Sequence, residues 1–531
     1  MCCNVHNLYF CWFPNNGVMI RSLFLLLITS GVLSFSAQAQ VAWPAAPSVD
    51  YPAQGSKSHS LDYVMVDVAN WEEYIVGTKF QTNKEIPAQI TYYTKDNEFI
   101  FSTTAGIRLS GIFIRKLPQK SIAVEFSTRE FQSEKVFYNI FPTRDYDRIR
   151  GFVLRAHGNP MGLTFFKDAM MNESVDEHTD LEYSGYRPVI VYINGKYQGL
   201  HNLREKKDKD YLKSLHNLSG SDIVVFDVDG GVNAKPNVDW EEMMAYVSSN
   251  DLSKKEHYDW MSDRVEIDNF IEYHICHMFY SNTDWPKANV KVWRPKGGKW
   301  RWMFFDCDRG FMNVNFNMIE HNVGQDQWAL RRQDEKVDAR LNKSTILIRE
   351  LMTNDEFALK FARRYQDLLN TAFTPERLNA LVASCADRIR PEVSHHITYW
   401  KDIKNEFTYQ YVKTLAEWNQ NVSGMAGFIK QRPGHVRKHI NDKFDLGGHA
   451  PATISIADPL GGYLQVNSMT IEDASFTGEY FKNLPIDITA YPKEGYAFDR
   501  WEGLSQKSAT VTITRDQMAS GVTAVFKAIE K

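Results

Sequence analysis

Cysteine is scarce in this sequence, and its scarcity excludes a fold held together by disulfide bonds. Only six of the 531 residues are cysteine, and Cys2, Cys3 and Cys11 precede a predicted cleavage site. The other three are Cys276, Cys307 and Cys385, which are too widely spaced for a disulfide framework. We therefore expect free, buried thiols, with a single bridge from Cys385 to Cys276 or Cys307 as the alternative.

A strong charge of one sign is also missing. The formal net charge is −4, which indicates neither a nucleic-acid-binding protein nor a polyanion. After one apolar stretch near the N-terminus, the sequence has no further apolar run long enough to cross a membrane. Nucleic acid is therefore not an expected partner, and no transmembrane span is expected in the mature chain.

The apolar stretch near the N-terminus predicts an export signal. Arg21 precedes the apolar run 22–35, and Ser-Ala-Gln-Ala at 36–39 provides small residues for cleavage. We predict that residues 1–39 are a signal peptide, with Met19 as an alternative start. The Pro-, Ala- and Ser-rich stretch 40–60 is predicted to be a linker. The expected location is the periplasm, the cell surface or the medium.

The rest of the chain predicts two domains. Residues 61–445 begin with alternating strands and end with helical periodicity over 345–445, a pattern typical of an α+β fold with two lobes and a cleft between them. In this region the Asn194-Gly195 pair predicts a type I′ hairpin. Residues 450–531 contain short strands separated by Gly and Asp turns, which predict a small all-β sandwich.

The segment from Ser281 to Gly310, SNTDWPKANVKVWRPKGGKWRWMFFDCDRG, contains the clearest functional pattern. Asp284 and Asn289 are spaced as D-x-x-x-x-N, a predicted hairpin follows, and its second strand leads to Asp306 and Asp308. This is the layout of the metal site of protein kinases, although no H-R-D precedes the loop and no D-F-G follows it. The segment predicts phosphoryl transfer on an atypical scaffold.

Four stretches together resemble the CotH (spore coat protein H) kinase family, whose members are secreted or surface atypical kinases. They are GIRLSGIFIRKLPQKSIAVEF, GFVLRAHGNP, VIVYINGKYQGLHNLREKKDKDYL, and NTDWPKANVKVW with WMFFDCDRGF. The resemblance covers about residues 61–440. His201 stands where the family usually has Tyr, Phe305 replaces its usual Trp, and the usual polar run after Gly111 is missing. The fragment GYAFDRWEG resembles β-repeat modules of bacterial surface proteins, for which we expect a folded-spacer role rather than a ligand site.

The resemblance and the residue chemistry together predict the roles of individual side chains in ATP-dependent transfer to a protein or glycan acceptor, a Ser/Thr protein being the expected class. Asp306, Asp308 and Asn289 are predicted to hold Mg²⁺ or Mn²⁺ through oxygen ligands, and Asp284 is the predicted base that orients the acceptor. The predicted cofactor-binding residues are Lys120, with Lys116 as its competitor, Glu205 and Arg108. Arg108 and Arg155 either contact phosphate or brace the acidic loops, and bracing is favoured.

Other interpretations remain open from the sequence. The D-C-D segment is also compatible with a glycosyltransferase that holds a nucleotide sugar through Mn²⁺, and a non-catalytic surface or glycan-binding protein would need none of this chemistry. His274 and His277 share one helix face, but no second ligand pair with zinc-site spacing accompanies them. The four tryptophans of the hairpin region could stack on a base or a sugar, although core packing is favoured: Trp285, Trp293, Trp300 and Trp302.

Overall fold

The computed structural model describes residues 59–77, 84–111, 115, 117–126, 136–146, 148–156, 163–228, 237–286, 288–324, 339–403 and 411–529. The chain divides into residues 1–45 and 46–531, and every described residue belongs to the second unit. The predicted signal peptide, Lys116 and the predicted linker up to residue 58 lie outside the described residues. The fold contains both helices and strands, with strands first, helices next and sheets again at the end.

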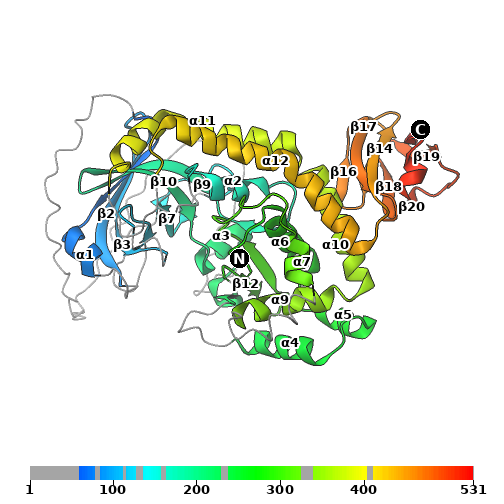
Figure 1. The fold of residues 1–531 in the computed structure, drawn as a ribbon, viewed down its shortest axis with the longest axis horizontal. Coiled ribbons are helices and arrows are strands. Elements are labelled where there is room, and N and C mark those ends of the chain that lie inside the picture. Colours follow the sequence, from blue (N-terminus) through cyan, green and yellow to red (C-terminus); the bar gives the residue numbers. More distant parts are fainter. Residues whose placement is uncertain are drawn as a thin grey trace, which may run out of the picture. The chain divides into compact units, whose positions relative to one another are not determined.

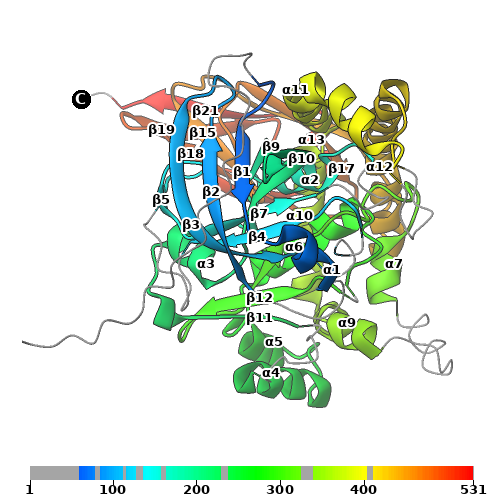
Figure 2. The ribbon, with the colours of Figure 1, turned by 90° about the vertical axis from the view of Figure 1, so that its left-hand side faces the viewer.

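Seven strands of the first half close into a barrel, which Figure 2 shows in blue and cyan. In barrel order they are β1 (Tyr63–Asp67), β2 (Ile86–Tyr93), β3 (Phe99–Leu109), β4 (Ile122–Glu125), β7 (Gly151–Arg155), β10 (Lys196–Glu205) and β9 (Tyr186–Ile193). All neighbours are antiparallel except β1 and β9, whose parallel pairing closes the barrel. Alternation in the sequence predicts strands but not this closure, because β1 and β9 are far apart along the chain.

The two faces of the barrel strands have different roles. Val124, Leu154 and Leu203 are fully buried in the barrel core. Because successive side chains of a strand point to opposite faces, Arg155 and Arg204 lie on the outer face of β7 and β10. The β9–β10 turn has positive φ at Asn194 (46°) and Gly195 (74°), which confirms the predicted type I′ hairpin.

Short elements border the barrel, and a second, smaller sheet lies among helices. The short elements are α1 (Trp71–Gly77), β5 (Val136–Phe137) and β6 (Arg148–Ile149). The second sheet has the order β11 (Ile223–Asp227), β12 (Lys291–Pro295), β13 (Arg301–Phe304) and β8 (Glu182–Tyr183). The hairpin β12–β13 is the one predicted around the Pro-Lys-Gly-Gly turn. It is this hairpin that carries the chain from the Asp284 loop to the acidic pair.

The helical part occupies the middle of the chain (Figure 1). Its helices are α2 (Lys167–Ser174), α3 (Lys209–His216), the 3₁₀ turn Gly220–Asp222, α4 (Val238–Ser249), α5 (Lys255–Ser262), α6 (Ile267–Phe279), α7 (Met318–Val323), α9 (Ala339–Leu351), α10 (Asp355–Asn370), α11 (Pro375–Trp400) and α12 (Leu415–Phe444). The predicted helical character of 345–445 is confirmed for the described residues of this range, 345–403 and 411–445. α6 is buried at every position except Asp268, so it forms the centre of this part and holds the Asp284 loop at its C-terminal end.

Buried side chains settle two of the sequence predictions. Cys276, Cys307 and Cys385 are free and buried, as expected. The four tryptophans of the hairpin region are at most 3% exposed, which confirms core packing rather than an exposed stacking surface. Among the described residues, none of the helices is both long enough and apolar enough to cross a membrane.

The C-terminal part is a β-sandwich, as predicted. One sheet has the order β17 (Ser475–Phe481), β14 (His449–Ile456), β21 (Val522–Ala528) and β19 (Tyr496–Glu502). The other has the order β16 (Met469–Ile471), β15 (Gly462–Val466), β18 (Ile486–Pro492) and β20 (Thr510–Ile513), and α13 (Arg515–Met518) precedes the last strand. Residues of both sheets form one hydrophobic cluster.

The sandwich packs directly on α10. Asp367 of α10 is fully buried and accepts hydrogen bonds from Asn467 Nδ2 (3.0 Å) and from the backbone N–H of Ser468 (3.0 Å). Arg363 forms an ion pair with Asp487 (2.6 Å). Phe481 of β17 belongs to the main hydrophobic core of the helical part. The sandwich is therefore packed against the helices through both polar and apolar contacts.

Candidate functional site

Two carboxylates follow β13 and are bridged by one guanidinium. β13 ends at Phe304, and Asp306 has a left-handed backbone (φ 53°) that turns the chain away from the sheet. Nη2 of Arg155, the last residue of β7, donates to Asp306 Oδ1 (2.7 Å) and to Asp308 Oδ2 (2.6 Å). The Cys307 side chain is fully buried. Both carboxylates thus lie on one side and the thiol in the core, and Arg155 braces the acidic pair, the role that the sequence favoured.

A third carboxylate, which the sequence reasoning did not single out, completes the group. Asp168 lies in the first turn of α2 and is 5% exposed. Its Oδ1 accepts the backbone N–H of Cys307 (2.7 Å), and its Oδ2 is 3.0 Å from Nη1 of Arg204. One oxygen from each of Asp168, Asp306 and Asp308 lies within 4.8 Å of the other two. An acidic residue in the first turn of a helix is common for local reasons, so the sequence carries little sign of this role.

Two carboxylates of this acidic triad have pKa values shifted in opposite directions. Although burial alone would raise it, the pKa of Asp168 is held well below its usual range by Arg204, by Arg155 and by the Cys307 N–H. The pKa of Asp308 is raised instead, because burial and the neighbouring carboxylates of Asp306 and Asp168 outweigh its bond to Arg155. Three hard oxygen donors that repel one another match the ligand chemistry of Mg²⁺ or Mn²⁺.

Basic side chains surround the triad. Lys167, next to Asp168, donates from Nζ to the carbonyl of Gly310 (3.1 Å), and burial lowers its pKa to about 8. Burial, together with the nearby Arg204 guanidinium, lowers the pKa of Lys207 to about 7. The Lys207 ammonium also lies 5.0 Å from the centre of the Phe305 ring. The site therefore combines metal-type oxygens with cations suited to phosphate oxygens.

The Asp284 loop lies beside the acidic pair. Asn282 donates from Nδ2 to the backbone carbonyl of Asp306 (3.3 Å), and the N–H of Thr283 donates to the carbonyl of Arg309 (3.4 Å). The structure also brings two predicted site residues together, because Asn289 Nδ2 is 3.5 Å from Asp284 Oδ2. Asn289 has positive φ (65°), a conformation that asparagine tolerates well. Asp284 is not one of the three clustered carboxylates.

The predicted cofactor-binding residues Lys120 and Arg108 lie on the barrel. Lys120 precedes β4, and its Nζ donates to the carbonyls of Arg115 (2.7 Å) and Leu117 (2.5 Å) of its own loop. Its backbone carbonyl contacts His201 Nε2 at 3.1 Å. Arg108 lies on β3, with Nε 3.9 Å from Glu85 Oε1. Neither side chain contacts the acidic triad in the interactions that the structure describes.

Glu205, the third predicted cofactor-binding residue, lies at the end of β10. Its carboxylate accepts bonds from Arg144 Nε and Nη2 (2.8 Å for the shortest) and from the backbone N–H of Gly185 (2.6 Å). Both side chains of the Arg144–Glu205 ion pair are almost fully buried. In the structure, the charged partner of this predicted cofactor-binding residue is Arg144.

The comparison with protein families decides the family. The model described as "CotH kinase protein" matches residues 107–436, more than half of the chain. The chain belongs to the CotH kinase family. A second model, described as "Divergent InlB B-repeat domain", matches residues 464–530. No curated protein matches the chain.

The CotH match includes every residue of the site but cuts through structural elements. It begins within β3, so β1 and β2 lie outside it although both are needed to close the barrel. It ends within α12, and the B-repeat match begins within β15, after the first strand of the sandwich. The acidic triad, the Asp284 loop and the basic side chains therefore lie within the CotH region.

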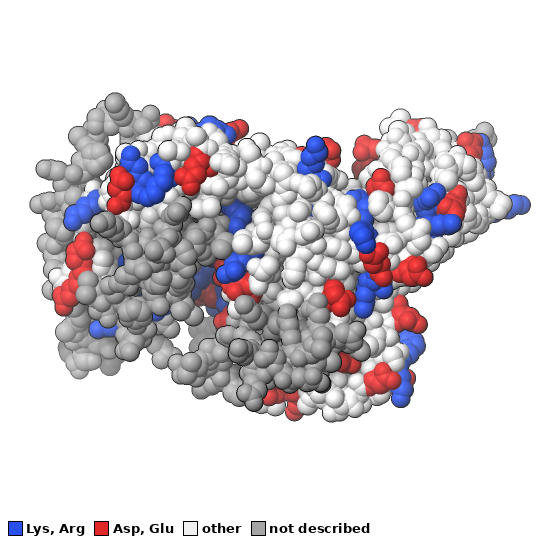
Figure 3. Space-filling view, viewed as in Figure 1, with Lys and Arg blue, Asp and Glu red and all other residues white. Residues whose placement is uncertain are grey.

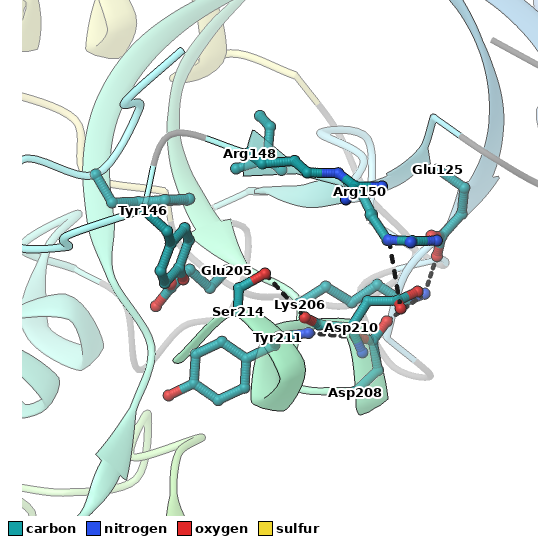
Figure 4. Close-up of a pocket in the computed structure, with 13 residues that line it drawn as sticks. Glu125, Tyr146, Arg148, Arg150, Glu205, Lys206, Asp208, Asp210, Tyr211 and Ser214 are labelled. Atoms are coloured by element: carbon teal, nitrogen blue, oxygen red, sulfur yellow. Dashed lines mark hydrogen bonds and ion pairs between the residues drawn. The ribbon is translucent and has the colours of Figure 1, made fainter. Parts of the chain in front are cut away.

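A polar pocket opens further along the outer face of the barrel (Figure 4). Its lining includes Glu125 of β4, Gly151 of β7, and Lys206 and Asp208 at the start of the segment that leads to α3. Lys206 pairs with both Glu125 and Asp208. Gly151 and Arg155 are the first and last of the five residues of β7 and share its outer face, so the pocket and Arg155 are about 13 Å apart along the strand.

The histidines of α6 have partners that do not involve a metal. His274 Nδ1 lies 2.9 Å from the carbonyl of Phe270, and His277 stacks on Trp285 with an interplanar angle of 6°. In the part of the chain that the structure describes, the only group of three or more potential His, Cys, Asp or Glu ligands is Asp168, Asp306 and Asp308.

Proposed function

We propose that this CotH-family protein is an exported atypical kinase that transfers the γ-phosphoryl group of ATP to a Ser or Thr hydroxyl of a protein, in a reaction that needs Mg²⁺ or Mn²⁺. The observation that carries the proposal is the placement of three carboxylates, a bridging arginine and the Asp284–Asn289 pair beside one another within the family region. Phosphoryl transfer requires positioning and charge neutralisation more than covalent catalysis.

In this proposal Asp306, Asp308 and Asp168 hold the metal ion, with Asn289 as a further oxygen donor. The metal, when bound, would neutralise charge on the phosphates of the donor. Asp168 is an additional, buried ligand beside the three residues expected from the sequence. The Cys307 N–H and Arg204 keep its carboxylate ionised. The donor set consists of oxygens alone, which favours hard cations over zinc.

Asp284 is the proposed base. It accepts a contact from Asn289 Nδ2 at 3.5 Å, which orients its carboxylate, and the loop that carries it is tied to the backbone of Asp306 and Arg309. A carboxylate at this position can accept the proton of an incoming hydroxyl as the acceptor oxygen attacks the phosphorus atom. This arrangement supports an alcohol acceptor, that is, the hydroxyl group of either a protein side chain or a glycan.

The outer face of β7 supports one orientation for ATP. Its phosphates would lie at the Arg155 end, near Lys207, and its nucleoside toward the pocket at Gly151, Glu125 and Lys206. The separation of about 13 Å along the strand is comparable to the length of an extended nucleoside triphosphate. Arg155 and Lys207 are then better placed for phosphate than Lys120, whose ammonium bonds to its own loop. Lys120, Arg108 and Glu205 remain candidates for supporting the nucleotide.

The surface is consistent with a protein or glycan acceptor rather than a nucleic acid. On the face in Figure 3, the Lys and Arg side chains of the described residues are interspersed with Asp and Glu. Export to the periplasm, the cell surface or the medium is supported by the expected signal peptide and by the B-repeat match. The acceptor is thus expected to be an extracytoplasmic protein.

The test measures both binding and transfer. We expect ATP with Mn²⁺ to raise the melting temperature, whereas nucleotide sugars with Mn²⁺ leave it unchanged. Asp306→Asn and Asp284→Asn should each lower phosphoryl transfer from γ-labelled ATP at least 100-fold, with melting temperatures close to that of the natural protein. The control is Asp259→Asn on α5, an aspartate that is 54% exposed.

Retention of transfer in both variants would exclude the kinase proposal. Stabilisation by nucleotide sugars alone would favour the glycosyltransferase. A protein that binds glycans, shows no metal-dependent ATP turnover and is indifferent to Asp306→Asn would be a non-catalytic member of the family.

A further inference from the structure

Arg155 lies between two of the three proposed metal ligands. A single nitrogen, Nη2, is within hydrogen-bond distance of both Asp306 and Asp308. An arginine guanidinium stays charged in proteins. A permanently charged group thus lies where a divalent cation would meet the same two carboxylates.

We propose that Arg155 is a placeholder cation. Without metal it holds Asp306 and Asp308 together, and when a divalent ion binds it leaves these carboxylates and turns to the phosphate oxygens of the donor. The inference rests on the proposed metal-dependent transfer from ATP, and it adds a conformational role for one side chain. If Arg155 were instead a fixed brace, it would keep its hydrogen bonds to Asp306 and Asp308 both with and without bound metal.

The two arginines that pair with the triad, Arg204 and Arg155, differ in burial, and this difference makes Arg155 the one that can exchange its partners. Arg204 is only 4% exposed at its side chain and pairs with Asp168, which is itself held by the Cys307 N–H. The Arg155 side chain is 22% exposed, and its carboxylate partners are 32% and 16% exposed. Its backbone is fixed by the pairing of β7 with β10, opposite Asn202. Only the long side chain would have to change rotamer.

The balance of charge gives the direction of the exchange. Asp306 and Asp308 share the single positive charge of Arg155, whereas Asp168 pairs with Arg204. A divalent ion bound to the same carboxylates would bring two positive charges next to the Arg155 guanidinium, which weakens their hold on it. The planar guanidinium can then make two parallel hydrogen bonds to a phosphate group, a geometry that lysine lacks.

The first test uses metal alone. Mn²⁺ is titrated calorimetrically into the full chain and into Arg155→Gln, without nucleotide, and the natural protein is crystallised with Mn²⁺. We expect Arg155→Gln to bind Mn²⁺ at least tenfold more tightly, and the crystal structure to show Arg155 detached from Asp306 and Asp308. Weaker or equal binding in the variant, or a metal-bound structure with both contacts retained, would overturn the proposal.

A matched control is available on the same barrel. Arg187 of β9 has a similar side-chain exposure, 21%, and forms one ion pair with Asp62 at 2.6 Å. Arg187→Gln should leave the affinity for Mn²⁺ unchanged, and it reports the effect of removing a barrel arginine in general. Parallel gains in Arg187→Gln and Arg155→Gln would contradict a specific role for Arg155.

The second test asks where Arg155 goes. A hydrolysis-resistant ATP analogue is titrated in the presence of a chelator into the natural protein, Asp308→Asn, Arg155→Gln and the double variant. Asp308→Asn should bind the analogue at least fivefold more tightly, because Arg155 then keeps only one of its two carboxylate partners, and the double variant should lose this gain. A gain that persists without Arg155 would reflect only the loss of a negative charge and would count against the placeholder.

The two tests separate this inference from the proposed function. If the analogue fails to bind the natural protein even with Mn²⁺, the kinase proposal fails. The Mn²⁺ titration and the metal-bound structure then still decide whether Arg155 is displaced.

Discussion

At the scale of single residues, two carboxylates of the acidic triad, Asp168 and Asp306, differ in how much they contribute to the stability of the fold. Asp168 is buried, bonded to the Cys307 N–H and paired with Arg204, whereas Asp306 is 32% exposed and shares Arg155 with Asp308. Breaking a buried ion pair leaves a buried charge without compensation. We expect Asp168→Asn to lower the free energy of unfolding by about 3–5 kcal/mol, and Asp306→Asn by less than about 1 kcal/mol.

Chemical denaturation of the two variants, with phosphoryl transfer measured in parallel, checks this difference. Both should lose transfer, but only Asp168→Asn should lose much stability. Equal stability of the two variants would mean that Asp168 is not the structural anchor of the site.

The residue scale also shows why the sequence predicted only part of the site. Asp284, Asn289, Asp306 and Asp308 occur within one stretch whose order and spacing are informative. Asp168 and Arg204 come from separate elements, and each has an ordinary local explanation, so only the folded chain places them together. Lys120 shows another limit of the sequence, which predicts it as a cofactor-binding residue but does not reveal that its ammonium bonds to two carbonyls of its own loop.

At the scale of elements, α11 is joined to the β9–β10 hairpin through a buried histidine. His396 Nδ1 accepts the backbone N–H of Leu200 (3.0 Å), so the ring must be neutral, and burial lowers its pKa to about 3. Gly199 has φ 82°, and a Cβ there would lie 2.4 Å from His396 Nδ1. The contact therefore depends on a glycine and on an unprotonated histidine.

This contact predicts a specific loss of stability in acid. The pKa of His396 is below the value of about 6.5 for an unfolded chain, so its contribution is complete above pH 6.5 and declines as the pH falls toward 3. At pH 5 the loss should be about 2 kcal/mol relative to pH 7.5. We expect this part of the pH dependence to disappear in His396→Gln. The measurement is the free energy of unfolding at both pH values.

The control for the acid effect is His395→Gln on the same helix, because the His395 side chain is 60% exposed. The pH dependence of His395→Gln should match that of the natural protein. If His396→Gln retains the full dependence, other groups are responsible for it.

Individual helices and strands were predicted better than the way in which they pair and pack. Alternation and the Asn194-Gly195 turn predicted the β9–β10 hairpin, and helical periodicity predicted α10 to α12, because these signals are local. Closure of the barrel requires β1 to pair in parallel with β9, and no local pattern encodes that pairing. The packing of the sandwich on α10 is likewise invisible in the sequence, since Asp367 and Asn467 are ordinary polar residues there.

At the scale of the whole molecule, the B-repeat region is part of the same structural unit as the CotH region. The face of α10 that meets the sandwich combines the Arg363–Asp487 ion pair, the buried Asp367 carboxylate, and Gln366, whose Oε1 accepts the N–H of Phe481 (2.8 Å). Phe481 and Leu484 also belong to the main hydrophobic core. If the sandwich were a spacer connected only by a linker, its removal would leave the stability of the helices unchanged. The observed contacts predict instead that its removal lowers the stability of the helical part.

We therefore expect removal of the sandwich by truncation after Gly447 to lower the melting temperature of the remaining chain by about 5 °C or more. The reason is that α10 would expose a face whose apolar and polar partners come from β17 and the β15–β16 turn. Calorimetry of the full chain should show one cooperative transition that includes the sandwich. Two separate transitions, together with an unchanged melting temperature after truncation, would show that the sandwich is a spacer. A single transition that moves to lower temperature would establish it as a stabilising part of the kinase-family domain.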